Sequence, residues 1–167
     1  MKKKVWIFNH YATDTMLDHG GRHYWFAKYL TRAGYDVRIF CASTVHDTDI
    51  NFDVGESGYC EKMVDGLKYT LIQTSNYVGN GKSRVKNMYQ FYRRIFRVVK
   101  NYEKPDVIFA SSVHPLTLLA GIKIAKKLGV KCICEVRDLW PESLVEYDII
   151  SRNHIVTKLM YRGERSL

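Results

Sequence analysis

Apolar residues along this chain form short runs, and the longer segments between the runs have apolar positions at helical spacing. Runs such as "VWIF" and "VIFA" have no polar face, which is typical of strands in a parallel sheet that is covered on both sides. Strands are predicted at 3–9, 36–42, 106–111 and 130–136. The last of these contains "VKCICEV" and is also expected to be buried.

The intervening segments predict amphipathic helices at 21–34, 83–102 and 114–129. Residues three and four apart share one face of a helix, which identifies the positions expected to face the sheet. In the first helix these are His23, Phe26, Ala27 and Leu30. In the second they are Met88, Phe91, Ile95, Val98, Val99 and Tyr102. In the third they are Leu118, Ile122 and Ala125.

The remaining segments predict loops, one hairpin and two further helices. Residues 10–21 and 43–58 are polar and lack periodicity, so both are expected to be loops. Two extended runs within 60–74 surround Asp65-Gly66, a strong signal for a hairpin turn. Helical segments are expected from 141 to 150 and in the tail beyond 152. The pattern as a whole predicts an α/β fold, a single Rossmann-like three-layer domain with a mainly parallel sheet.

Composition supports an ordered globular domain and narrows its partners. The chain has 167 residues, of which 46% are hydrophobic and 26% charged. No apolar run approaches the roughly 20 residues that cross a bilayer, and "VWIF" is too short for a signal peptide, so a cytoplasmic location is expected. The net charge of +9 suits nucleic acid, anionic lipid or phosphorylated substrates. Without zinc-ligand spacing or a nucleic-acid-binding motif, we expect no nucleic-acid partner.

The four cysteines predict no chemistry of their own. In a cytoplasmic protein they are expected to be reduced. Cys132 and Cys134 lie two apart on a predicted strand, so they share one face and suit core packing. We expect no metal site at Cys41, Cys60 or this pair.

Several polar residues follow the predicted strands, where open parallel sheets bind their ligands. Asn9 and His10 come after the first strand, and His114 comes after the third. All three are candidate substrate-binding residues. Each also fits a plainer role, because Asn9 and His10 can satisfy loop carbonyls and His114 can cap the helix that starts at Pro115.

Gly20, Gly21 and Arg22 stand immediately before the first helix. Two glycines permit a ligand to approach the backbone, and a helix N-terminus presents free N–H groups to an anion. Arg22 adds positive charge, so all three are candidate substrate-binding residues; the alternative is a flexible turn. "GGRHYW" lacks the third glycine of GxGxxG, which argues against a dinucleotide oxidoreductase.

The stretch "EVRDLWPES" places an opposed charge pair, Arg137 and Asp138, at the end of the last strand. The two residues could form a local ion pair that tethers the loop, but an exposed ion pair contributes little stability, so a ligand role is considered as well. Arg137 offers a planar fork for phosphate or carboxylate, and Asp138 offers an acceptor for sugar hydroxyls or a general base. The apolar face of Trp140 could pack against a sugar ring or within the hydrophobic core. Glu142 is a further substrate-binding candidate and also complements the dipole of its helix.

The order of these motifs resembles the N-terminal half of family-4 glycosyltransferases. The resemblance rests on "NHYATDTMLDHGGRHYWFAKYLTRAGYDVRIF", "VDGLKYTLIQT" and "KPDVIFASSVHPLTLLAGIKIAKKLGVKCICEVRDLWPES", and it extends from residue 4 to about 160. It is greatest to the bacterial branch that assembles surface polysaccharide such as capsule or O-antigen, whose members carry R-D-L-W-P-E-S at this place.

The resemblance implies the N-terminal half of a GT-B fold, with residues 1–167 as one truncated domain and the donor-binding C-terminal domain absent. It implies the acceptor-binding half of a retaining, hexosyltransferase-type enzyme that uses a nucleotide-sugar donor and a sugar or lipid-linked acceptor, without metal or cofactor. The isolated fragment is expected to be inactive. Many relatives carry a histidine where this chain has Arg137 or Asp138, which leaves the individual roles of these catalytic candidates open.

Other functions remain compatible with the sequence. One alternative is a fragment of a GT-B-type sugar-nucleotide epimerase, and another is a non-catalytic module that binds an anion or a sugar. A membrane contact is also predicted, at the inner face of the plasma membrane, from one flank of helix 83–102. That flank carries Tyr89, Tyr92, Arg93, Phe96, Arg97 and Lys100, with Arg94 beside it. The alternative is a solvated helix face whose aromatic residues pack on the hairpin.

Overall fold

The computed structural model describes residues 2–139, 141–146, 148 and 151–164 of the chain. Within these residues, six strands form one sheet in the order β3-β4-β2-β1-β5-β6. Every neighbouring pair is parallel except β3 and β4, which form an antiparallel hairpin. The strands are β1 (Lys4–Phe8), β2 (Asp36–Ala42), β3 (Tyr59–Val64), β4 (Leu67–Ile72), β5 (Val107–Ser112) and β6 (Lys131–Val136).

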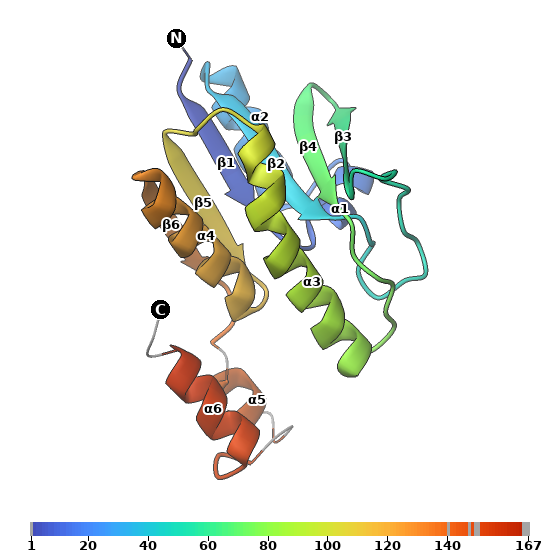
Figure 1. Cartoon of the computed structure of the whole chain (residues 1–167), viewed down its shortest axis with the longest axis vertical. Helices are drawn as coiled ribbons and strands as arrows, with labels where there is room; N and C mark the ends of the chain where they lie inside the picture. The colour runs from blue at the N-terminus through green and yellow to red at the C-terminus, as the bar shows by residue number, and fades with distance from the viewer. Residues whose placement is uncertain (1, 140, 147, 149–150, 165–167) are drawn as a thin grey trace.

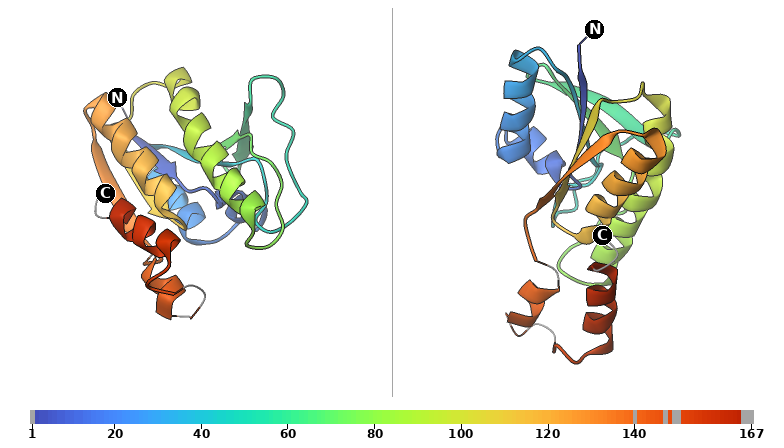
Figure 2. Two further views of the ribbon diagram at one scale, coloured as in Figure 1. Left: turned by 60° about the horizontal axis from the view of Figure 1, so that its bottom comes forward. Right: turned by 90° about the vertical axis from the view of Figure 1, so that its left-hand side faces the viewer.

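Helices cover both faces of the sheet, which gives the three layers predicted from the sequence (Figures 1 and 2). Helices α1 (Ala12–Leu17) and α2 (Arg22–Arg32) lie on one face. Helices α3 (Lys82–Val98) and α4 (Pro115–Leu128) lie on the other, with the 3-10 turn η1 (Val99–Asn101) after α3. This arrangement, with its mostly parallel sheet, is a Rossmann-like α/β fold.

The side chains of the central strands alternate between two hydrophobic cores, as strand geometry requires. In β1, Trp6 and Phe8 point into the core beneath α3 and α4, where Phe91 and Ile95 are fully buried. Val5 and Ile7 point into the core beneath α1 and α2. The predicted double-sided cover is therefore confirmed for the centre of the sheet.

Asp65 and Gly66 form the hairpin turn, as their order in the sequence predicts. Both have positive φ, 51° and 77°, as a two-residue hairpin turn of this kind requires. The hairpin joins the main sheet because β4 pairs in parallel with β2. The carboxylate of Asp65 also accepts a hydrogen bond from Tyr24 Oη at 2.6 Å, which ties the turn to α2.

The prediction of a loop over residues 10–21 is wrong in part, because this segment contains helix α1. Its inward positions, Ala12, Thr13 and Met16, are buried against the sheet, and Thr13 Oγ1 donates to the carbonyl of Ala42. The helix has six residues and no side-chain cap. Its burial against the sheet stabilises it, and six residues are too few to show a helical pattern of apolar positions in the sequence.

The predicted inner face of α2 needs one correction. His23 and Ala27 are buried as expected, but Tyr24 is buried in place of Phe26, which is 42% exposed. The difference is a rotation of the helix that lets the Tyr24 hydroxyl reach Asp65. Phe26 instead covers Phe109 at the flank of the sheet, with the ring centroids 5.8 Å apart.

The prediction that β6 is buried is also wrong. β6 is the edge strand of the sheet, and the side chains of Ile133 and Val136 are 53% and 57% exposed. An edge strand has a neighbour on one side only, so an apolar run there need not be covered. Cys132 packs partly against the α3/α4 core, whereas Cys134 is exposed and does not pack in the core.

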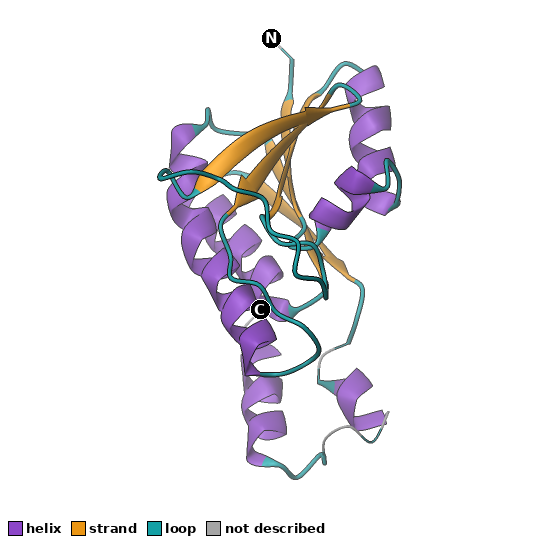
Figure 3. Cartoon of the chain, turned by 90° about the vertical axis from the view of Figure 1, so that its right-hand side faces the viewer, coloured by secondary structure: helices purple, strands orange, loops and turns teal. Residues whose placement is uncertain are grey.

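The chain after β6 leaves the three-layer body. Helices α5 (Glu142–Glu146) and α6 (Ile155–Glu164) project beyond the carboxyl ends of the strands (Figures 1 and 3). They confirm the two helical segments expected in the tail. Trp140 lies outside the described residues.

Candidate functional site

Two polar networks meet at the carboxyl edge of the sheet, where the sequence places most of its candidate residues. β1 ends at Phe8, so Asn9 and His10 follow it directly into this edge. Both side chains are buried, at 2% and 0% exposure. Adjacent residues leaving a strand point in opposite directions, so Asn9 joins one network and His10 joins the other.

The first network converges on Glu135, a carboxylate in the edge strand β6. Its Oε2 accepts hydrogen bonds from Ser111 Oγ at 2.6 Å and from His23 Nε2 at 3.1 Å. Its Oε1 accepts from Arg22 at 2.5 Å. Burial opposes ionisation of Glu135, but the hydrogen bonds from Ser111 and Arg22 outweigh that effect and lower its pKa. Glu135 is therefore a carboxylate at neutral pH.

The hydrogen bonds around His23 define its tautomer. Asn9 Oδ1 accepts from the backbone N–H of Tyr11, so Asn9 Nδ2 is the group that donates to His23 Nδ1, at 2.8 Å. His23 must then carry its proton on Nε2 and donate it to Glu135. Burial lowers the pKa of His23 despite the carboxylate, which keeps the ring neutral.

The second network is a buried chain that runs from Asn87 through His10 to His114. Asn87 Nδ2 donates to the carbonyl of Ser75 at 2.7 Å and to Thr44 Oγ1 at 3.0 Å, so its Oδ1 is the acceptor for His10 Nε2 at 2.6 Å. His10 then accepts at Nδ1 from His114 Nε2, at 2.9 Å. Each link fixes the proton position in the next ring.

The chain ends at His114 Nδ1, an unprotonated nitrogen that has no hydrogen-bond partner in the described residues and is sealed from solvent. Burial lowers the pKa of His114 to about 3, and burial together with the neighbouring His114 lowers that of His10 well below its usual value. Both rings are therefore neutral. His114 occupies the N-cap position of α4, which is one of the two roles predicted for it, although its side chain makes no cap hydrogen bond.

The two glycines before α2 differ in what they permit. Gly21 has φ 80° and ψ 168°, a conformation that is essentially restricted to glycine, and a Cβ there would lie 2.8 Å from Thr15 Cγ2. Gly20 has no such restriction, and a Cβ there would meet only the carbonyl of Asp18 at 3.5 Å. The local backbone therefore requires glycine at 21, whereas it accepts a side chain at 20.

Arg137 and Asp138 follow β6 at the same edge, and both are exposed. The backbone N–H of Arg137 donates to Ser112 Oγ at 3.0 Å, which fixes the start of the segment. Among the described residues, no ion pair joins Arg137 to Asp138 or to any other residue. The possibility that they form a local tether is therefore not realised, and both charges face solvent.

Glu142 is not part of either network. It pairs with Arg152 and accepts a hydrogen bond from Tyr161, which ties α5 to α6. Arg22 belongs to the first network, through Glu135. Of the nine candidates, Arg22 contacts Glu135 directly and Asn9 reaches it through His23, and His10 and His114 contact each other. Gly20, Gly21, Arg137 and Asp138 lie at the same edge, whereas Glu142 lies in the α5–α6 contact.

Sequence reasoning missed Glu135, Ser111 and Asn87 as members of the site. Glu135 carried a signal, because it is an acid within an otherwise apolar strand and directly precedes the Val136-Arg137-Asp138 segment. Ser111 also stands at a strand end. Asn87 lies in a long helix, and nothing in the local sequence places it beside His10.

The match to known families agrees with this architecture. A family model described as Glycosyltransferase Family 4 matches residues 24–166, which is most of the chain. The chain belongs to Glycosyltransferase Family 4. No curated protein matches it.

Membership of Glycosyltransferase Family 4 indicates glycosyl transfer as the activity and, in general terms, a sugar-nucleotide donor and an acceptor as partners. The Rossmann-like sheet is consistent with one half of a GT-B fold. Among the described residues, no helix has the length and apolar character needed to cross a bilayer. The same residues contain no group of three or more His, Cys, Asp or Glu placed to hold a metal ion.

Proposed function

We propose that this chain is the acceptor-binding half of a retaining glycosyltransferase. The enzyme moves a hexosyl group from a nucleotide sugar to a precursor of bacterial surface polysaccharide, such as capsule or O-antigen, carried on a lipid. It acts in the cytoplasm, at the inner face of the plasma membrane. The observation that carries the proposal is the family match, combined with Arg137 and Asp138, which are exposed beside the Glu135 network and form no ion pair with any other described residue.

The carboxyl edge has groups suited to each part of a sugar acceptor or donor. Asp138 can accept a hydrogen bond from a sugar hydroxyl or take its proton. Arg137 presents a planar fork to a phosphate or carboxylate. Gly20 lies where a ligand can approach the backbone before α2. Catalysis of this kind depends chiefly on positioning and on stabilisation of the charge of the leaving group.

His10 and His114 are buried, so their role in this proposal is to position the site rather than to contact a ligand. The two rings hold the loop after β1 against the start of α4 through their shared hydrogen bond. Asn9 and Glu135 hold the same loop against α2 and β6. Both networks thereby fix the segments that carry the exposed candidate residues.

In this proposal residues 1–167 form one N-terminal domain, and the donor is held mostly by a C-terminal domain that these residues do not include. Activity is accordingly assigned to the full-length enzyme. The 167-residue chain alone should fold without transferring sugar from any nucleotide sugar.

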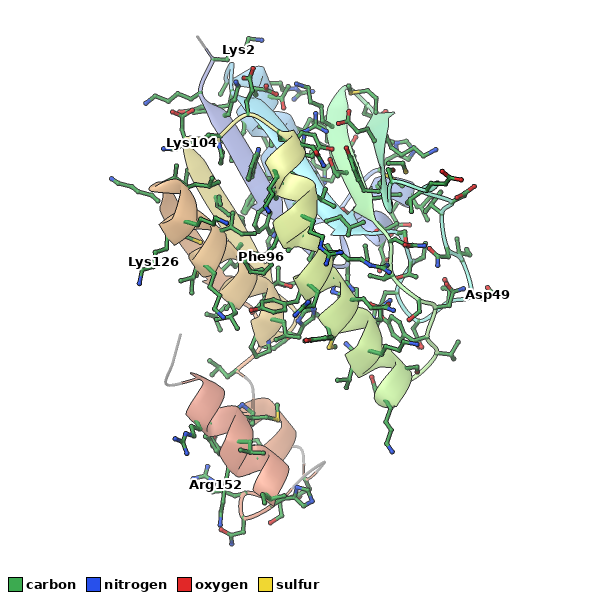
Figure 4. The ribbon with its side chains drawn as sticks, viewed as in Figure 1. Lys2, Asp49, Phe96, Lys104, Lys126 and Arg152 are labelled. Atoms are coloured by element: carbon green, nitrogen blue, oxygen red, sulfur yellow. The ribbon has the colours of Figure 1, made fainter. Side chains whose placement is uncertain are left out.

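Replacement of Asp138 in the full-length enzyme tests the proposal. Asp138→Asn should lower kcat by about 10²–10⁴-fold if the carboxylate takes a proton. Its melting temperature should stay near that of the wild type, because the side chain is exposed and forms no ion pair within the described part of the chain. Asp49→Asn is the matched control, since Asp49 is an exposed aspartate on the far side of the molecule from β5 and β6 (Figure 4).

The assay follows label from a panel of nucleotide sugars into a lipid extract of bacterial membranes. Transfer with the anomeric configuration retained supports the proposal. Conversion of the nucleotide sugar without transfer would indicate an epimerase. Binding with neither reaction would indicate a non-catalytic module. Unchanged turnover of Asp138→Asn with a lowered melting temperature would make Asp138 a structural residue.

A further inference from the structure

The positive charge of the protein is concentrated in one of its two helical layers. Helices α3 and α4 with η1 contain ten lysines and arginines and no aspartate or glutamate. The whole chain has 26 basic and 17 acidic residues, so the rest of it is nearly neutral. The layer consists of adjacent helices on one face of the sheet, so these charges share one side of the molecule (Figure 2).

A groove of about 610 Å³ runs between α3 and α4 on this side. Its floor is apolar and includes Val99, Ile124 and Leu128. Figure 4 labels Phe96 between the two helices, where its ring packs edge-on against Tyr92 at 5.3 Å. The groove therefore combines an apolar base with aromatic walls.

Cations surround this groove and are free to meet an external anion. Arg93, Arg97, Lys100 and Lys127 line it, and all four side chains are exposed. In the part of the chain that the structure describes, none of these four forms an ion pair or a side-chain hydrogen bond. Lys126 points outward from the same layer (Figure 4).

Arg94 is engaged within the protein, unlike Arg93 and Arg97, so it does not belong to the membrane contact expected from the sequence. Its guanidinium donates to the carbonyl of Gln73 at 2.5 Å, so it is held by the loop after β4. Tyr92 and Phe96 pack against the core beneath α3 and α4. Tyr89 is 52% exposed and is the aromatic residue on this flank that is most available to a partner.

We infer that the α3/α4 face docks on an anionic lipid bilayer. Cations that form no ion pair in the described part of the chain lie beside the exposed ring of Tyr89, and this combination matches the headgroup layer, where rings enter the boundary and cations meet anionic lipid. The apolar floor of the groove suits the upper part of an acyl chain. The inference does not depend on sugar transfer, because vesicle binding and turnover are measured separately.

The outer face of α2 also carries exposed aromatic residues, but its cations are engaged. Lys28 Nζ lies 5.0 Å and 5.1 Å from the ring centroids of Tyr24 and Trp25, and Arg32 lies 5.8 Å from that of Tyr29. These cation–π contacts hold both cations against rings of the same helix. The face of α2 is therefore the weaker candidate and supplies a useful comparison.

The test is sedimentation of the 167-residue chain with vesicles of phosphatidylglycerol and phosphatidylcholine, against phosphatidylcholine alone. A cation beside an anionic surface contributes roughly a fivefold gain in binding, so replacement of Arg93, Arg97 and Lys127 by Gln should weaken binding about 100-fold. The Debye length falls from about 10 Å at 0.1 M salt to about 3 Å at 1 M. Binding of the wild type should therefore be lost at the higher concentration.

The matched control replaces Lys3, Lys62 and Lys131 by Gln, three exposed lysines outside the α3/α4 layer. It removes the same charge and should change binding by no more than about threefold, a distant-charge effect that salt screens. An equal loss in the control, or no loss in the α3/α4 variant, would reject this face as the contact. Equal binding to both vesicle types would also overturn the inference.

Two further measurements distinguish other partners and surfaces. If Trp25→Ser with Tyr29→Ser abolishes vesicle binding while the α3/α4 variant retains it, the contact belongs to α2 and the inference is wrong. If a DNA oligonucleotide binds the face more tightly than the anionic vesicles at the same salt, the partner is a nucleic acid. Vesicle binding that follows the α3/α4 charges alone supports the inference.

Discussion

The two polar networks at the carboxyl edge of the sheet each join an asparagine to a histidine, but they lie in different surroundings. The Asn87–His10–His114 chain is sealed, and every member is no more than 1% exposed. The Asn9–His23–Glu135 network opens to solvent through Arg22, whose side chain is 57% exposed. A buried polar group that loses its partner carries its full desolvation penalty, whereas an exposed one recovers water. The sealed chain should therefore govern stability, and the open network should govern the site.

Loss of Asn87 should have the largest effect on stability. Asn87→Ala removes the acceptor of His10 Nε2 and both donors to Thr44 and Ser75, all within a buried site. We expect a loss of about 3 kcal/mol, since each buried group left unpaired costs about 1–3 kcal/mol. Urea denaturation measures it. Asn101→Ala is the control, because Asn101 is exposed at the end of η1, and it should cost less than about 0.5 kcal/mol.

The second largest loss of stability is expected at Gly21, which directly precedes Arg22 of the open network. Gly21→Ala should cost about 2 kcal/mol, because φ 80° with ψ 168° is strained for any side chain and its Cβ would meet Thr15. Gly20→Ala should change stability by less than about 0.5 kcal/mol. Thermal unfolding of both variants provides the comparison, and similar losses would contradict the geometry of the turn.

Only Gly20 allows a kinetic test of ligand approach at this turn. A side chain at position 21 would strain the backbone, so a change in kinetics there could not be assigned to the ligand. Gly20→Ala leaves the backbone unstrained, so a rise in KM of the full-length enzyme with unchanged stability would place a ligand at this turn. Normal kinetics would leave the pair with a purely structural role.

The pH dependence of stability reports on the buried histidines of both networks. The pKa of His114 is about 3 in the folded chain and about 6.5 when unfolded. The unfolded state therefore binds the proton first, and stability falls as the pH drops below about 6.5. At pH 5 this amounts to about 2 kcal/mol relative to pH 7. The lowered pKa values of His10 and His23 act in the same direction and the same window.

Replacement of His114 measures its share of this dependence. The free energy of unfolding of His114→Gln should fall less between pH 7 and pH 5 than that of the wild type, even though the variant is less stable at pH 7. The pKa of Glu135 is lowered, so its contribution is present above about pH 4.3 and is lost only below it. The same slope in both proteins would show that His114 does not titrate as its burial requires.

The strand-and-helix pattern was largely readable from the sequence, because it depends on periodicity that each segment carries by itself. β2 at 36–42 and the Asp65-Gly66 hairpin agree with their predictions. The errors arise where tertiary position decides. The apolar sequence of β6 does not reveal that the strand lies at the edge of the sheet, and α1 is too short for its pattern to exceed that of a loop.

The site was predictable only in part, for a related reason. Strand ends locate Asn9, His10 and Arg137, because the carboxyl edge of a parallel sheet follows from strand order. The partner of His10 is Asn87, 77 residues away in α3, and only the folded chain brings them together. Likewise Glu142 has its partners in α6, which a first-turn position in α5 does not indicate.

The smallest effect is expected for Glu135, at the centre of the open network. Glu135→Gln keeps a side-chain oxygen for Ser111 and His23 but removes the charge that faces Arg22. Because Arg22 is largely exposed, the stability loss at pH 7 should be under about 1 kcal/mol, and it should shrink in high salt and as the pH falls below about 4.3. Glu61→Gln is the matched control, since Glu61 forms a comparable exposed pair with Arg38 at 2.9 Å on the other side of the sheet. Both variants should lose similar stability.

Only Glu135→Gln should alter KM or kcat in the full-length enzyme, because Glu135 holds the start of α2 against β6. A loss for Glu135→Gln as large as that for Asn87→Ala would remove the distinction between a sealed network that stabilises the fold and an open one that positions the site.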